Sequence, residues 1–186
     1  MRCFGDGDPV YESYHDTEWG RPQLQERQLY EKVCLEAFQA GLSWITVLRK
    51  RPALREAFEG FDPAVVAELD IEPLLGDARL IRSLPKLTAC VVNARATLTL
   101  RGHGGLPALV RRYAASGPAP ERRDEVPART PGSTALAREL KRAGFTFVGP
   151  VTAYSLLQAC GLVGDHLREC DVRAEVEAER AQALAS

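Results

Sequence analysis

Cysteine and histidine side chains near both ends of this 186-residue chain constrain its fold more than any other feature. Two of the three histidines belong to this group, which comprises Cys3, His15, His166 and Cys170. His166 and Cys170 are four residues apart, a spacing that puts two side chains on one face of a helix. Two cysteines and two histidines complete a closed tetrahedral zinc shell with no open position for a reacting water. If the four converge, the two ends of the chain lie together.

The residues alone leave an alternative open. Cys3 can belong to a frayed terminus and His166 can cap a helix, and two separated ligand pairs form a weaker pattern than two Cys-x-x-Cys knuckles. The spacing therefore defines a candidate structural metal site. Any catalytic chemistry is expected elsewhere in the chain.

The composition is typical of a globular protein with its own core. Hydrophobic residues make up 45% of the chain, and the length fits one domain or two small lobes. Cys34, Cys90 and Cys160 have apolar helical surroundings, so we expect buried thiols and no disulfide framework. There is no leader-like N-terminus and no apolar run of about 20 residues. We expect a cytoplasmic protein.

The net charge of −1 does not by itself indicate a nucleic-acid-binding protein. The charges are segregated, however, with basic clusters at residues 49–55, 79–86 and 138–142. Each cluster taken singly is typical of a solvated helix face. The second interpretation is that the clusters together form one basic surface on a nearly neutral protein.

The hydrophobic pattern is helical along most of the chain. Apolar positions recur at steps of three and four from Gln25 to Ala40, and Gly41 then ends that helix. We expect Ser43 to cap the next helix and Pro52 to interrupt it. Further helices are predicted at 85–102, 106–115, 133–143 (capped by Ser133) and 154–160. No alternating run favours a sheet, so the predicted fold class is all-α.

The segment from Gly144 to Ala153 predicts a helix-hairpin-helix. Gly144 and Gly149 flank a short apolar turn that contains Phe147, and the N–H groups of the following helix form a natural phosphate site. An ordinary turn between two helices is the alternative. The motif indicates contact with DNA that does not depend on sequence.

The same segment resembles the helix-hairpin-helix superfamily of DNA glycosylases. Gly149, Thr152 and Ala153 match its Val-Gly-x-x-Thr-Ala motif. Val151 stands where bifunctional members have their lysine, and Gly164 stands where most members have an aspartate. The resemblance therefore implies no lyase step and no aspartate-assisted mechanism.

Three longer motifs, at residues 11–22, 35–44 and 144–150, closely resemble bacterial 3-methyladenine DNA glycosylase I, and the match runs from Cys3 to about Cys170. The resemblance implies a single glycosylase domain over residues 1–170, with two helical lobes and a base pocket between them. Residues 171–186 then form a short acidic helix or a disordered tail. It also implies a monomer that acts on double-stranded DNA with alkylated adenine, and one structural Zn²⁺ bound by Cys3, His15, His166 and Cys170.

The activity that the resemblance implies is hydrolysis of the bond between deoxyribose and an N3-alkylated adenine flipped from the duplex. Such a base is already cationic and leaves readily, so the pocket needs no strong general acid. We expect Glu36 to be the catalytic and base-binding carboxylate, because it lies on the apolar stripe of its helix. The alternative for Glu36 is a pair with a core arginine or a cap on a neighbouring helix.

The resemblance assigns roles to further residues. Tyr14, Trp44 and Phe4 are expected to form the walls of the base pocket, and Trp19 to pack in the core. Gly41 and Leu42 are expected to form a wedge that enters the gap left by the flipped base. The remaining expected DNA contacts are Arg82, Lys86, Phe147 and Gly149.

The sequence also departs from the family. A tryptophan is usual two positions after the first ligand cysteine, whereas this chain has Cys3-Phe4-Gly5. Phe4 can replace the missing ring, or Gly5 can leave the pocket more open. We therefore hypothesise that 3-methyladenine is accepted and that a bulkier N3-alkyl adduct is tolerated. The competing class is a zinc-stapled protein that binds damaged DNA without catalysis.

Overall fold

The computed structural model describes residues 1–5 and 7–185, and in this part of the chain every regular element is a helix. The all-α prediction is confirmed. The α-helices are α1 (Pro9–Thr17), α2 (Glu26–Gln39), α3 (Trp44–Ala57), α4 (Pro63–Val66), α5 (Leu84–Leu100), α6 (Gly105–Arg111), α7 (Pro131–Arg142), α8 (Pro150–Ala159) and α9 (Arg173–Ala185). Short 3₁₀ turns lie at Glu59–Phe61, Pro73–Gly76, Arg101–His103 and Arg123–Glu125. None of the described helices is long and apolar enough to cross a membrane.

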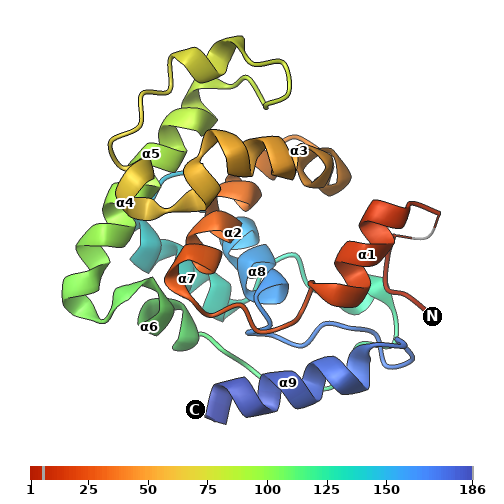
Figure 1. Cartoon of the computed structure of the whole chain (residues 1–186). Helices are drawn as coiled ribbons and strands as arrows, with labels where there is room; N and C mark the ends of the chain where they lie inside the picture. The colour runs from red at the N-terminus through yellow and green to blue at the C-terminus, as the bar shows by residue number, and fades with distance from the viewer. Residues whose placement is uncertain (6, 186) are drawn as a thin grey trace.

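Helix α2 lies at the centre of the molecule (Figure 1). Residues 29–38 are buried without interruption, because α3, α5, α6 and α8 all pack against this helix. A helix surrounded in this way needs no polar face. It nevertheless carries the buried charges of Glu31, Lys32 and Glu36.

The prediction that Pro52 interrupts the helix after Ser43 is wrong. Helix α3 continues through Pro52 to Ala57. The ring of Pro52 is exposed, while Leu48 and Leu54 on either side of it are buried. Packing on both sides of the proline therefore maintains the helix despite the lost backbone hydrogen bond.

The prediction that Ser133 is the N-cap of its helix is also wrong. Thr130 caps α7, since its Oγ1 accepts from the Ser133 amide at 3.0 Å, and the Ser133 hydroxyl accepts from the Thr130 amide at 2.9 Å. Pro131 is the first helical residue, where a missing N–H costs nothing. Ser133 is thus the third residue of the helix and the second half of a reciprocal cap.

The C-terminal residues form helix α9, which packs on the body of the protein (Figure 1). Val176 is fully buried, and Arg180 donates to the carbonyl oxygens of Gly161 at 2.8 Å and Ala115 at 3.2 Å. Arg21 pairs with Glu175 of the same helix at 3.1 Å. Of the two forms expected for this tail, the described residues have the helix, over Arg173–Ala185.

Candidate base pocket and metal site

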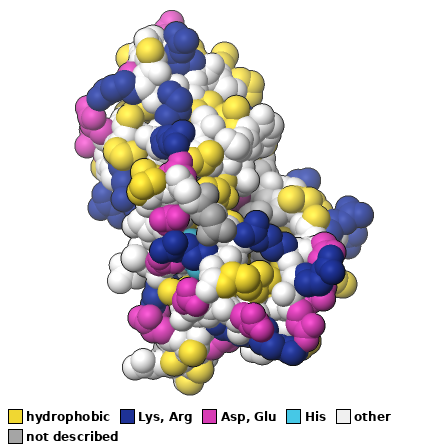
Figure 2. Space-filling view, turned by 90° about the vertical axis from the view of Figure 1, so that its right-hand side faces the viewer, with side chains coloured by type: hydrophobic (Ala, Val, Ile, Leu, Met, Phe, Trp, Pro, Cys, Tyr) yellow, Lys and Arg dark blue, Asp and Glu magenta, His cyan; other side chains and the backbone are white. Residues whose placement is uncertain are grey.

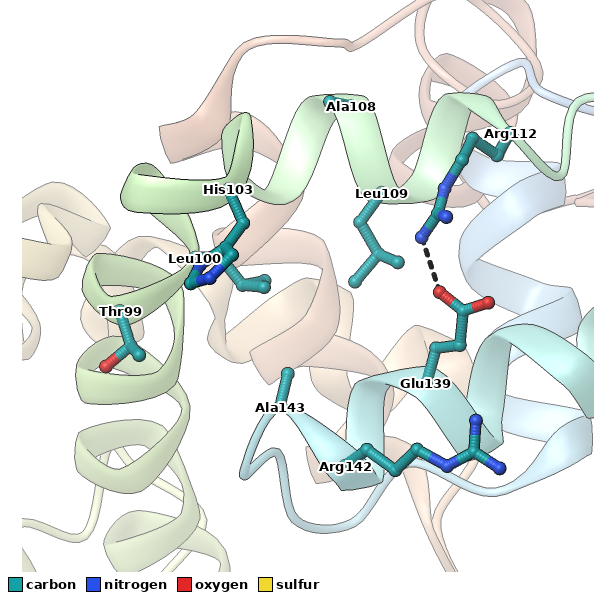
Figure 3. Close-up of a pocket in the computed structure, with 9 residues that line it drawn as sticks. All are labelled: Thr99, Leu100, His103, Ala108, Leu109, Arg112, Glu139, Arg142 and Ala143. Atoms are coloured by element: carbon teal, nitrogen blue, oxygen red, sulfur yellow. Dashed lines mark hydrogen bonds and ion pairs between the residues drawn. The ribbon is translucent and has the colours of Figure 1, made fainter.

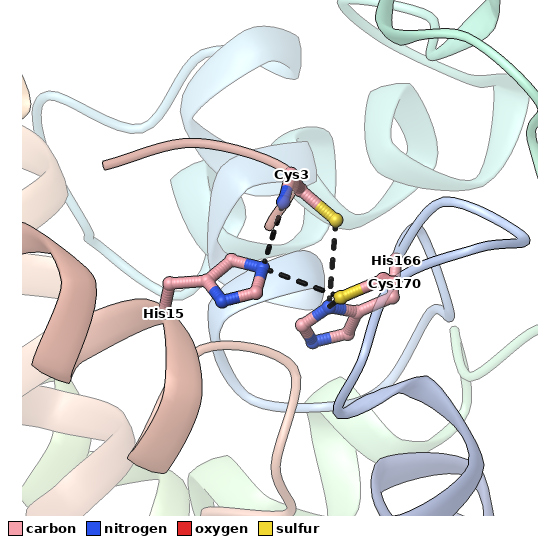
Figure 4. A group of neighbouring side chains, drawn as sticks. All are labelled: Cys3, His15, His166 and Cys170. Carbon is pink, nitrogen blue, oxygen red and sulfur yellow. Dashed lines mark hydrogen bonds between the residues drawn. The ribbon is translucent and has the colours of Figure 1, made fainter. Parts of the chain in front are cut away.

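The four side chains at the ends of the chain converge in one buried cluster (Figure 4). Their ligand atoms all lie within 4.8 Å of one another. His166 Nδ1 lies 3.6 Å from Cys3 Sγ and 3.3 Å from Cys170 Sγ, and Cys170 Sγ lies 3.5 Å from His15 Nε2. A tetrahedral zinc ion with bonds of about 2.3 Å to sulfur and 2.0 Å to nitrogen sets its ligands roughly 3.3–3.8 Å apart. The cluster therefore has the size of a closed metal shell.

Hydrogen bonds orient both imidazole rings. His15 Nδ1 lies 2.8 Å from Asp16 Oδ1, and His166 Nε2 lies 3.0 Å from the carbonyl oxygen of Trp19. Each bond places a proton on the outer nitrogen and leaves a lone pair on the inner one. The inner Nε2 of His15 accepts from the Cys3 amide at 3.1 Å. Burial also lowers the pKa of His166 to about 4, which keeps its ring neutral. The four residues can hold a metal ion.

His166 and Cys170 do not share a helix face, contrary to the prediction from their spacing. Residues 166–170 form a turn in which the Cys170 amide donates to the carbonyl oxygen of Leu167 at 2.9 Å. The turn brings the two ligands as close as a helix would. The next helix, α9, begins only at Arg173.

A cavity of about 210 Å³ lies beside the metal cluster, between the N-terminal segment and helices α1, α2, α3 and α8. It brings together all four residues predicted to bind a base. Its lining consists of Phe4, Tyr11, Tyr14, Trp19, Glu36, Gln39, Trp44, Ser155 and Gln158.

Aromatic rings make up most of the cavity wall. The ring of Phe4 lies 4.8 Å from that of Tyr11 and 5.0 Å from that of Trp19, and Tyr14 lies 5.3 Å from Trp44. Phe4 thus lies against the rings where the family's tryptophan is missing. Trp19 packs against the hydrophobic core, as predicted. Its partly buried ring lines the cavity and lies 4.5 Å from the His166 ring, because the turn after α1 joins the cavity to the metal cluster.

Among the described residues, Glu36 is the one acidic residue in the cavity wall. Only 6% of the residue is exposed, and among the described residues none donates a hydrogen bond to it. Burial raises the pKa of its carboxyl to about 8, although the nearby Lys32 ammonium lowers it. The alternative that Glu36 pairs with a core arginine is wrong, since the buried Arg51 binds Glu18 and Glu31 instead.

A second buried polar group also lacks a partner. The indole nitrogen of Trp44 has no acceptor among the described residues. A cavity lined by an unpaired carboxylate and by the ring of an unpaired N–H donor suits a ligand that offers both a donor and an acceptor. Adenine offers both, through its amino group and its ring nitrogens.

Five residues of the cavity wall were not predicted: Tyr11, Trp19, Gln39, Ser155 and Gln158. Helical spacing is the signal that connects four of them. Tyr11 precedes Tyr14 by three residues and Gln39 follows Glu36 by three, while Ser155 and Gln158 form such a pair on α8. A second space of about 230 Å³ shares Glu36, Gln39 and Ser155 with the first, and reaches Val151 and Thr152 at the start of α8.

The residues predicted to contact DNA lie on the surface in two places. Leu42 is 39% exposed in the turn after α2, and Phe147 is 41% exposed in the hairpin between α7 and α8. The buried Asn93 of α5 fixes this hairpin, accepting from the Thr146 amide at 2.8 Å and donating to its carbonyl oxygen at 3.2 Å. Gly149 is the N-cap residue of α8.

The two predicted basic contacts differ in their surroundings. Lys86 donates to the carbonyl oxygens of Phe38, at 2.9 Å, and Ala40, and so closes the end of α2 beside Leu42. Arg82 is exposed and has no ion-pair partner in the described part of the chain. Figure 2 shows basic side chains over the upper part of the molecule, at the height of α3 and the segment that leads into α5.

A larger cavity, about 680 Å³, lies elsewhere, where the end of α5 meets α6 and α7 (Figure 3). It contains none of the predicted site residues. Arg112 and Glu139 form an ion pair at its wall, and Leu100 and Leu109 also line it. The cavity beside the metal cluster is the candidate site because the unpaired carboxylate is there.

Comparison with known proteins agrees with this arrangement. The sequence profile described as methyladenine glycosylase matches residues 4–174. The DNA-3-methyladenine glycosylase of Haemophilus influenzae is 44% identical over 169 residues, which cover 87% of this chain and 91% of that protein. The DNA-3-methyladenine glycosylase 1 of Escherichia coli is 45% identical over 170 residues, which cover 88% and 91%.

Solved structures share the fold. A crystal structure of 3-methyladenine DNA glycosylase I superposes with a TM-score of 0.88 at 42% identity. The match covers 92% of this chain and 98% of the chain in that structure. The enzyme from Staphylococcus aureus, studied for its recognition of 3-methyladenine, gives a TM-score of 0.87 at 35% identity, covering 92% and 95%. The fold is thus that of a helical DNA glycosylase. The chain belongs to the methyladenine glycosylase family.

Proposed function

We propose that this protein is a monofunctional DNA glycosylase that removes 3-methyladenine from alkylated duplex DNA. The observation that supports this best is Glu36, a buried carboxylate without a partner in a cavity of aromatic rings. A buried charge of this kind is costly unless a ligand compensates it. N3-methylated adenine carries the matching positive charge.

The cavity residues then divide the recognition of the base between them. Tyr14, Trp44 and Phe4 stack on the purine and attract its charge through their ring faces. Glu36 accepts from the amino group, and its carboxylate stabilises the cationic adduct over the neutral, undamaged base. Flipping places the damaged nucleotide in this cavity, since the bond to be cut is out of reach inside a duplex.

The reaction needs little assistance because the leaving group starts as a cation. The bond between the base nitrogen and the sugar C1′ breaks, its electron pair neutralises the base, and a water oxygen bonds to C1′ and releases a proton. No lysine lines either of the two adjoining spaces. The residue at the position of the lyase lysine is Val151, so the abasic sugar is left intact.

The surface residues hold the duplex while the base is extruded. Leu42, presented by Gly41, is placed to fill the gap in the base stack. Arg82 and Lys86 bind backbone phosphates on one side, and the hairpin with Phe147 and Gly149 binds the backbone on the other.

The metal cluster has a structural role in this proposal. Cys3, His15, His166 and Cys170 hold one Zn²⁺, which the two thiolates and two imidazoles enclose completely. The ion supplies bond energy that joins the N-terminal segment to the C-terminal turn. It takes no part in hydrolysis, because no coordination position is left for water.

Release of free base from methylated duplex DNA tests the function. The wild-type protein is expected to release 3-methyladenine and to leave the abasic strand uncut. Glu36→Gln keeps the volume of the side chain and removes the charge, so release should fall by at least about 100-fold, roughly 2.7 kcal/mol of transition-state stabilisation. A wild-type protein that binds abasic duplex yet releases no base is instead a non-catalytic binder.

A bulkier N3-alkyl adenine is the second candidate substrate. The space of about 230 Å³ that adjoins the base cavity and shares Glu36 with it supports this extension. The same release assay on duplex with a larger N3 adduct decides the matter. A protein that removes 3-methyladenine and ignores every larger adduct contradicts the wider range.

A further inference from the structure

A fully buried lysine lies one helical turn before Glu36 on α2. Lys32 has no exposed surface, its ammonium donates to Glu18, and its nitrogen lies 5.0 Å from the centre of the Tyr14 ring. An apolar side chain of similar size would be buried at this position without the desolvation cost of an ammonium. Packing of α2 therefore does not explain the lysine.

Lys32 is the inner end of a chain of five alternating charges. Glu18 also accepts from Arg51 at 2.7 Å, Arg51 donates to Glu31 at 2.7 Å, and Glu31 accepts from Arg55 at 2.8 Å. The Arg55 side chain is 50% exposed and that of Lys32 only 1%. Three cations and two anions leave a net positive charge, and water screens it least at the Lys32 end, next to Tyr14.

Few other charges act on Glu36. The titratable groups around it and around Lys32 come from the ends of α1 and α8 and from α2 itself: Tyr14, Glu18, Cys160 and Lys32. Helix α3 contributes Trp44, which does not titrate, and the Arg51 guanidinium, which acts on Tyr14 and is paired with Glu18 and Glu31. Burial raises the pKa of Tyr14 well above its usual range and that of Cys160 to about 12, so both are neutral near pH 7. Among the described residues, Lys32 is the cation that acts on the Glu36 carboxyl.

We propose that Lys32 is a positioning residue of the base site, which raises the ionised fraction of the Glu36 carboxyl and holds the Tyr14 ring in place for a cationic purine. This rests on the proposed function. Burial alone favours the neutral acid, which offers a cationic base far less attraction. A cation one turn away offsets that effect, while Glu18 compensates its charge and limits repulsion of the base.

The first test follows the Glu36 carboxyl directly in the ligand-free protein. Its ¹³C signal is titrated in glutamate-labelled wild type, Lys32→Met and Lys32→Arg, and is identified by its absence in Glu36→Gln. The midpoint should rise by about one pH unit or more in Lys32→Met, the effect of losing a nearby opposite charge, and should stay near the wild-type value in Lys32→Arg. Equal midpoints in wild type and Lys32→Met would falsify the proposal.

We expect the Lys32→Met variant to fold, so that its carboxyl titration can be compared with that of the wild type. Glu18 keeps Arg51 as a partner in Lys32→Met, so no unpaired buried anion is created. The double variant Lys32→Met with Glu18→Gln removes both charges together, and its midpoint should also lie above that of the wild type. A double variant that titrates like the wild type counts against the role of Lys32.

The second test measures release of 3-methyladenine against pH. Lys32→Met should be about 10-fold slower than wild type below the midpoint of Glu36 and should approach it at higher pH, while Lys32→Arg follows the wild-type curve. If the release rate of Lys32→Met is reduced equally at every pH and the titration midpoint of the Glu36 carboxyl does not move, Lys32 only supports the fold and the proposal is overturned. If the wild type releases no base, the proposed function fails, and the carboxyl titration still decides the role of Lys32.

Discussion

Glu36 combines a cost in stability with a function in binding. Its carboxyl occupies a site where the ionised form has no hydrogen-bond donor among the described residues, and burial raises its pKa to about 8. The folded protein therefore binds a proton that the unfolded chain releases near the ordinary value of 4.5. Because the native state holds more protons in this range, the free energy of unfolding falls as the pH rises from about 4.5 to 8.

Glu36→Gln should accordingly stabilise the ligand-free protein at alkaline pH. The variant and the wild type should be similar in stability near pH 5, and the advantage of the variant should grow by up to about 1.4 kcal/mol per pH unit towards pH 8. Urea unfolding at several pH values measures this difference. Glu56→Gln, at an exposed carboxylate paired with Arg79, is the control and should show no comparable trend.

The same site shows what sequence can reveal about single residues. The buried position of Glu36 follows from the apolar steps around it, and the pocket residues Tyr14 and Trp44 follow from the family motif. Trp19 packs against the core as predicted, but its place in the cavity wall was missed, because the sequence around an aromatic residue beside a turn does not show which cavity it lines. Lys32 was not singled out, since helical spacing places it among core positions but cannot reveal the ion chain through Glu18.

At the level of elements, the turn after α2 and the hairpin before α8 are both fixed by polar side chains from α5. Lys86 binds the last carbonyl groups of α2, and Asn93 binds both backbone groups of Thr146. A single helix thus positions the two surfaces that carry Leu42 and Phe147. This arrangement suits a protein that must grip the duplex on both sides of a flipped base.

Leu42→Gly is expected to impair extrusion of the base and spare its recognition. Without the wedge, single-turnover release from duplex DNA should fall by about 10-fold, or roughly 1.4 kcal/mol. Release from single-stranded DNA, where no gap needs filling, should change much less. Val65→Gly, at an exposed apolar residue on α4, is the matched control. Equal losses on both DNA forms would show that Leu42 supports only the loop.

The order of the helices could be predicted from sequence, because apolar spacing and Gly41 define α2 and the two hairpin glycines define the turn before α8. The errors have local causes. Pro52 stays within α3 because buried residues on both sides outweigh one lost hydrogen bond. His166 and Cys170 meet through a turn, since a spacing of four cannot distinguish a helix from a tight loop.

For the whole molecule, the metal cluster joins the N-terminal segment to the C-terminal turn, two parts of the chain that are far apart in sequence. Cys3 and His15 belong to the N-terminal segment that carries Phe4 and Tyr14, while Trp19 lies between the cavity and His166. Loss of the ion should therefore loosen one wall of the base pocket without removing any residue that contacts the base. Stability and base binding are coupled through this wall.

Cys170→Ser tests that coupling. The variant should lose bound zinc, and a loss of about 3 kcal/mol lowers the melting temperature of a domain of this size by roughly 6–12 °C. Affinity for free 3-methyladenine should fall with it, and a chelator should affect the wild type but not the variant. Cys90→Ser alters a thiol that is equally buried outside the cluster, and should lower the melting temperature while zinc content stays unchanged.

A comparison of Cys170→Ser with Glu36→Ala separates the structural role of the metal cluster from the role of the base pocket in excision. Near pH 5, where the charge of Glu36 costs little stability, Glu36→Ala should keep its zinc and its melting temperature and lose excision, whereas Cys170→Ser should lose zinc first and excision through the loosened wall. Metal analysis, thermal unfolding and base release on the same two proteins measure this. Full zinc content in Cys170→Ser, or loss of zinc in Glu36→Ala, would contradict the assignment of a structural role to the metal cluster and of excision to the base pocket.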